Sequence, residues 1–77
     1  MIIKLGPYRS NFKFVEHCYN NRRHENLDKL MTEIAVALNV PCVVIAHFLK
    51  EIAGDSPEIQ ASIESITKQY NYEGVIE

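Results

Sequence analysis

Residues 40–48 (VPCVVIAHF) form an almost unbroken apolar run, and this run limits the folds that the chain can adopt. Four of the nine residues are Val or Ile, and His47 is the polar one among them. Strands of a parallel sheet that is covered on both faces have this composition, because neither side of the strand meets water. An amphipathic segment precedes the run at residues 25–39. We therefore predict a small α/β fold, with a mostly parallel sheet covered by two or more helices.

A helix over the same residues is the alternative. Pro41 would stand at the first helical position and Gly54 would follow the last turn, and both residue types favour those places. The apolar spacing around a turn at Asn39 is similar to that of a helix-turn-helix, and residues 56–72 are similar to the third helix of LacI-type headpieces. The alternative is thus an all-α, three-helix fold of a DNA-binding regulator.

The side chains of the run decide between these alternatives. Base edges in the major groove are read mainly by Arg, Lys, Asn and Gln, whereas only His47 and Lys50 could read them here. An exposed face of Cys and Val would instead attract other apolar surfaces. We therefore favour the strand; if residues 40–48 are helical, their apolar face predicts docking to a protein rather than to DNA.

The segment before the run is a clear helix. Its apolar residues recur at intervals of three and four, which places them on one helical face: Leu27, Leu30, Met31, Ile34 and Leu38. Glu25 and Lys29 form a favourable pair four residues apart on the other face. Asn39 suits a left-handed helix end, and Pro41 disfavours helix at the residue before it, so the helix should end near Leu38.

The remaining elements are shorter. We predict a strand over residues 1–5, stopped by Gly6 and Pro7, and a last strand at residues 75–76. Residues 12–19 fit either a strand or a helix. Ser56 and Pro57 can begin a helix whose apolar face carries the following residues: Ile59, Ile63, Ile66 and Tyr70.

Size and composition point to one small domain over residues 1–77. A chain of this length buries only about 60% of its unfolded surface, so a homodimer or higher oligomer is expected. No apolar stretch reaches the ~18 residues that span a membrane, and two cysteines without a disulfide pattern indicate a cytoplasmic protein. The net charge of −2 gives little support to nucleic-acid binding.

One segment resembles a known family. Residues 21–51 contain a basic loop, an amphipathic helix, the phrase LNVP and then an apolar run that ends at His47 and Lys50. This order resembles part of the RecA-like core of hexameric replicative helicases. In that family a polar residue at the strand tip senses the terminal phosphate of the nucleotide, and the resemblance gives this role to His47, with Lys50 as the basic step beyond it.

The departures from that family shape the functional expectation. The sequence contains no glycine-rich phosphate loop, and Lys4 stands where the family's first strand would end in a magnesium-linked acid. We therefore expect no independent catalysis and no cofactor. The predicted function is that of a regulatory or accessory protein, of phage origin, that binds a larger protein of nucleic-acid metabolism. A phage inhibitor of a host protein, unrelated to either fold, is a further alternative.

Few side chains qualify as site residues. His47 and Lys50 are the candidates for sensing a ligand or phosphate, and Arg22, Arg23 and His24 are the candidates for contacting an anion or nucleic acid before a helix N-terminus. Cys42 is expected to be a small core residue. The spacings of the cysteines and histidines fit no common structural zinc site, so we predict no metal.

Overall fold

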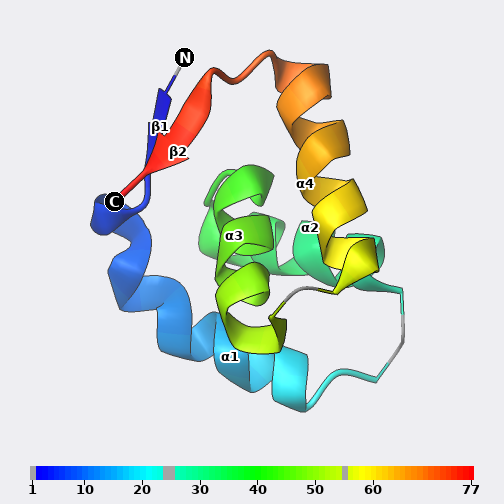
Figure 1. The fold of residues 1–77 in the computed structure, drawn as a ribbon. Coiled ribbons are helices and arrows are strands. Elements are labelled where there is room, and N and C mark those ends of the chain that lie inside the picture. Colours follow the sequence, from blue (N-terminus) through cyan, green and yellow to red (C-terminus); the bar gives the residue numbers. More distant parts are fainter. Residues whose placement is uncertain (1, 24–25, 55) are drawn as a thin grey trace.

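The computed structural model describes residues 2–23, 26–54 and 56–77 (Figure 1). In chain order its elements are strand β1 (Ile2–Lys4), the 3-10 helix η1 (Gly6–Asn11), helices α1 (Phe12–Asn20), α2 (Leu27–Leu38), α3 (Cys42–Ala53) and α4 (Pro57–Tyr70), and strand β2 (Gly74–Ile76). Figure 1 shows α3 in the centre of the molecule, with the other helices around it. The parallel sheet and its helices are present, but the helices form most of the structure.

The prediction of a strand over residues 40–48 is wrong, because these residues enter helix α3. The helix packs against α1, α2 and α4, whereas its residues Lys50 and Glu51 are exposed and His47 is half-buried. Six of its residues are fully buried, with side chains at 0% exposure: Val43, Val44, Ile45, Ala46, Phe48 and Leu49. A helix that is apolar on all sides is a buried helix, and over a short run its sequence cannot be told from that of a buried strand.

The burial of α3 also corrects the prediction that a helix over residues 40–48 would dock a partner protein through its apolar face. The neighbouring helices cover that face. Phe48, for example, meets the ring of Phe12 edge-on, with the ring centroids 5.4 Å apart. The central helix therefore serves mainly as the core of the fold, and of residues 40–48 only Pro41, Cys42 and His47 keep partial exposure.

The sheet is built from the two ends of the chain. Strands β1 and β2 pair in parallel, with Ile3 opposite Val75, and the backbone N–H of Leu5 donates a further 2.7 Å bond to the carbonyl of Ile76. The strands predicted at residues 1–5 and 75–76 are confirmed over their described parts. Ile3 and Leu5 point into the core, so the sheet closes the helical cluster on one side (Figure 1).

Helix α2 begins and ends as its sequence indicates. The side chain of Asn26 accepts a 3.1 Å bond from the backbone N–H of Lys29, which caps the first turn. At the other end Asn39 adopts the left-handed conformation (φ 55°, ψ 47°), so the predicted end near Leu38 is confirmed. The predicted pair of Glu25 and Lys29 lies partly outside the described residues.

The other two helices also follow their sequence signals. Ser56 precedes Pro57 with extended backbone, and the carbonyl of Ser56 accepts a 3.0 Å bond from Gln60, so α4 begins as predicted. Asn71 ends it in the left-handed conformation. Residues 12–19, which fitted either a strand or a helix, belong to α1, and its residue Val15 is fully buried.

Arg9 joins three parts of the chain. Its guanidinium donates a 2.7 Å hydrogen bond to Glu51 of α3 and a 3.0 Å bond to the side chain of Glu77. It also lies 5.3 Å from the ring centroid of Phe48 and 5.8 Å from that of Phe12. The hydrogen bonds that Arg9 donates to Glu77 and Glu51 raise the pKa of Arg9 above its ordinary value, and the bond to Glu77 lowers the pKa of Glu77. Arg9 therefore fastens η1 and the end of the chain to the core.

Candidate functional site

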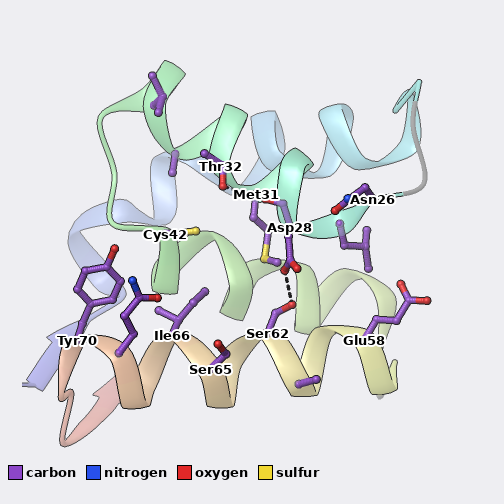
Figure 2. Close-up of a pocket in the computed structure, with 15 residues that line it drawn as sticks. Asn26, Asp28, Met31, Thr32, Cys42, Glu58, Ser62, Ser65, Ile66 and Tyr70 are labelled. Carbon is purple, nitrogen blue, oxygen red and sulfur yellow. Dashed lines mark hydrogen bonds between the residues drawn. The ribbon is translucent and has the colours of Figure 1, made fainter.

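A groove of about 1050 Å³ runs between α2 and α4. Both helices pack against α3, and the space left between them remains open above α3, as Figure 2 shows. The helices begin at the same end of the groove, so it has two distinct ends. Its lining residues are Asn26, Leu27, Asp28, Met31, Thr32, Ala35, Val36, Cys42, Glu58, Ala61, Ser62, Ser65, Ile66, Gln69 and Tyr70.

The floor of the groove is apolar. Met31 is only 1% exposed, and Cys42 and Ile66 are half-buried beside it. Burial, and secondarily the negative charge of Asp28, raises the pKa of the Cys42 thiol. A thiol with a raised pKa stays protonated at neutral pH, and it then behaves as a small apolar residue rather than a nucleophile. The floor therefore suits an apolar surface of a ligand.

One end of the groove exposes large apolar side chains. Val36, close to the end of α2, is 76% exposed, and Tyr70, the last residue of α4, is 57% exposed. The ring of Tyr70 lies 6.0 Å from that of Tyr72, centroid to centroid. The continuation of an apolar floor into exposed apolar side chains is typical of an interaction surface.

The other end is acidic. Asp28 lies in the first turn of α2 and Glu58 in the first turn of α4, and both line the groove (Figure 2). The hydroxyl of Ser62 donates a 2.7 Å hydrogen bond to the carboxylate of Asp28, which links α4 to α2 across the groove. None of the lining residues is Lys or Arg. The groove therefore runs from an acidic end to an apolar end.

His47 and Lys50, the candidates for phosphate sensing, both lie on α3. They line a second cavity, of about 340 Å³, together with Leu5, Glu51 and Glu77. Burial, and then the charge of Lys50, lowers the pKa of His47 against the opposing effect of Glu51. The same cavity holds the cation Lys50 and the carboxylates of Glu51 and Glu77, both of which accept hydrogen bonds from Arg9.

Arg22 and Arg23, the candidates for anion contact, are exposed in the segment after α1. The guanidinium of Arg22 donates a 2.8 Å bond to the carbonyl of Tyr19 and lies 4.3 Å from the centroid of its ring. The third candidate, His24, lies outside the described residues. The structure thus places these candidates on a different element from His47 and Lys50.

Sequence reasoning missed the groove. It assigned Met31, Ile66 and Tyr70 to apolar helix faces that were expected to be buried, and it did not consider what a gap between two such faces would expose. One signal was present, because Val36 is apolar but lies off the face that Leu30 and Ile34 define.

The described residues also bear on metal binding and on membrane insertion. Within residues 2–23, 26–54 and 56–77, no group of three or more His, Cys, Asp or Glu side chains is arranged to hold a metal ion. In the same part of the chain, no helix has the length and apolar character needed to cross a membrane.

Comparison of the chain with protein-family models, with curated proteins and with solved structures finds no match. The resemblances to the helicase core and to the helix-turn-helix stay predictions. The groove between α2 and α4 is therefore the feature from which a function can be proposed.

Proposed function

We propose that this chain is a non-catalytic regulatory or accessory protein that binds a helical segment of a larger protein in the groove between α2 and α4. The observation that carries this proposal is the apolar part of the groove lining. Met31 lies in its buried floor, and Val36 and Tyr70 line it with exposed apolar side chains. Proteins that receive an amphipathic helix in an apolar groove bury its apolar face in this way.

The length of the groove suits a helix. The twelve residues of α2 and the fourteen of α4 correspond to walls about 18 to 21 Å long at the rise of an α-helix. A bound helix of three to four turns would cover the exposed side chains of Val36 and Tyr70 and lie above the hydrogen bond from Ser62 to Asp28 that crosses the groove. Its apolar face would contact both walls and α3, as the helices of a bundle contact one another.

The kind of partner rests on the sequence alone. The resemblance of residues 21–51 to a helicase core is the ground for a partner in nucleic-acid metabolism, and a phage origin belongs to the same expectation. Helix α3 stands where that family has a strand, so His47 lies within a helix rather than at a strand tip. A helix-turn-helix regulator agrees with the order of α2, the turn at Asn39 and α3, but the burial of α3 weighs against it. A phage inhibitor of a host protein would use the same groove and differ only in the effect on its partner.

A matched pair of substitutions tests the groove. Val36→Lys places a charge in the groove, whereas Ala37→Lys places the same charge at the next residue of α2, which is exposed and does not line the groove. The probe is a fluorescent, designed amphipathic peptide of about four helical turns with leucines on one face. We expect Val36→Lys to weaken its binding about tenfold or more, because a charge would be forced against an apolar surface, and Ala37→Lys to leave binding unchanged. Equal effects of the two variants would contradict the proposal.

A further inference from the structure

The two ends of the groove differ in charge. This difference indicates where a bound helix should carry its own charged side chains. Of the 15 described side chains that line the groove, Asp28 and Glu58 are the charged ones. Both stand in the first turn of their helices, so both lie in the half where α2 and α4 begin, while Tyr70 lies at the other end (Figure 2). A ligand therefore meets negative charge in one half and apolar side chains in the other.

Among the described residues, the negative charge of Asp28 and Glu58 is only partly balanced. The N-termini of α2 and α4 each contribute about half a positive charge, against one full negative charge on each carboxylate. Ser62 donates a neutral hydrogen bond to Asp28. Among the described residues, no Lys or Arg forms an ion pair with Asp28 or Glu58. A cation from outside the chain would supply the missing charge.

Resting on the proposed function, we infer that the bound helix carries Lys or Arg in its last turn, between Asp28 and Glu58, and runs antiparallel to α2 and α4. The dipole of the bound helix gives this direction, because basic side chains are favoured in the last turn of a helix, where they complement its negative end. The apolar first turns of the ligand would then lie on Val36 and Tyr70.

Three peptides that share one leucine face test the inference. The first has two lysines in its last turn, the second has two glutamates there, and the third has the lysines in its first turn. Binding is followed by fluorescence anisotropy. We expect the first peptide to bind more tightly than the second at low salt, by a factor on the order of five, as two exposed ion pairs would give. High salt should remove most of this difference, because it screens exposed charges.

A second matched pair assigns the preference to the groove. Glu58→Lys should reverse the order of the first two peptides, whereas Glu64→Lys should not, since Glu64 is an exposed residue of α4 that does not line the groove. Thermal unfolding of each variant is the control that checks whether both remain folded. The direction is read from a spin label on the first residue of the first peptide, which should broaden the amide signals of Val36 and Tyr70 and spare those of Asp28 and Glu58.

The outcomes separate the inference from the function on which it rests. If no peptide binds, or if Val36→Lys has no effect on binding, the proposed function and the inference both fail. If the peptides bind in the groove but lysine and glutamate versions bind equally, or the label broadens the acidic end, the inference alone fails. If light scattering shows a dimer that Val36→Lys dissociates, a second copy of the chain occupies the groove, and this too overturns the inference.

Discussion

The hydroxyl of Ser62 on α4 donates a 2.7 Å hydrogen bond to the carboxylate of Asp28 on α2. This bond crosses the groove and joins two helices that otherwise pack mainly against α3 (Figure 2). It therefore helps to set the separation of the groove walls, on which the proposed docking of a helix depends.

Removal of this bond should loosen the walls without unfolding the core. We expect Ser62→Ala to lower the free energy of unfolding by about 0.5–1.5 kcal/mol, the usual net value of one hydrogen bond. Amide hydrogen exchange in α4 should also become faster than in α3. Ser65→Ala is the control, because Ser65 lines the same groove on the same helix and the structure shows no hydrogen bond from its hydroxyl to a described residue. The same loss of stability in both variants would show that the bond does not matter.

The left-handed backbone of Asn39, in the connection between α2 and α3, predicts how substitutions at this residue change the stability. Glycine adopts this conformation without steric cost, whereas a residue with a Cβ and no side-chain hydrogen bond is strained there by about 1–2 kcal/mol. Asn39→Gly should therefore match or exceed the original stability in urea unfolding, and Asn39→Ala should lose about 1 kcal/mol. A more stable alanine variant would mean that residue 39 is not left-handed.

The contact between Arg9 and Glu77 makes the stability of the folded chain depend on pH in the acidic range. The hydrogen bond from Arg9 lowers the pKa of Glu77 in the folded chain below its ordinary value of 4.5. Its stabilising effect is therefore complete above pH 4.5 and is lost as the pH falls through the lower, folded pKa. The melting temperature of Glu77→Gln should lie below that of the original chain at neutral pH, and the two should converge in acid. A gap that persists to low pH would show that the contact is not ionic.

His47 should respond to pH in a separate range. Burial lowers its pKa in the folded chain below the ordinary value of 6.5. Because the unfolded chain then binds the proton more readily, stability should fall as the pH drops below 6.5 and level off below the folded pKa. Proton NMR titration of the imidazole should give a midpoint below 6.5, and His47→Gln should remove this part of the pH dependence. A midpoint above 6.5 would contradict the half-buried placement on α3.

Local signals in the sequence were enough for the ends of the helices and for the strands. Asn39, Gly6 and Pro57 act through their own backbone preferences, so their effects can be predicted without knowledge of the rest of the chain. The parallel strand pair formed as expected at the two ends of the chain, although the sheet was expected to include residues 40–48 as well. The helix ends and the positions of the strands depend on residues close together in the sequence, whereas the pairing of the strands joins the two ends of the chain.

Features that depend on tertiary contacts were not predictable in the same way. Whether Val43 and Val44 belong to a strand or to a central helix depends on how many neighbours surround them, and an apolar run fits both cases. The exposure of Tyr70 depends on the angle between α2 and α4, which no local signal fixes. The groove exists because both helices pack on α3 and leave Val36 and Tyr70 uncovered. The described cation–carboxylate cluster at Arg9 likewise joins residues far apart in the chain.

The most direct test of the account is the mapping of the bound peptide by two-dimensional NMR of the labelled protein. Titration with the peptide that carries lysines in its last turn should shift the amide signals of groove residues on both walls, including Met31, Val36, Ile66 and Tyr70. Signals around His47 and around Arg22 should stay in place. Shifts concentrated around either of those residues, or no saturable shifts at all, would contradict the assignment of the groove between α2 and α4 as the binding site.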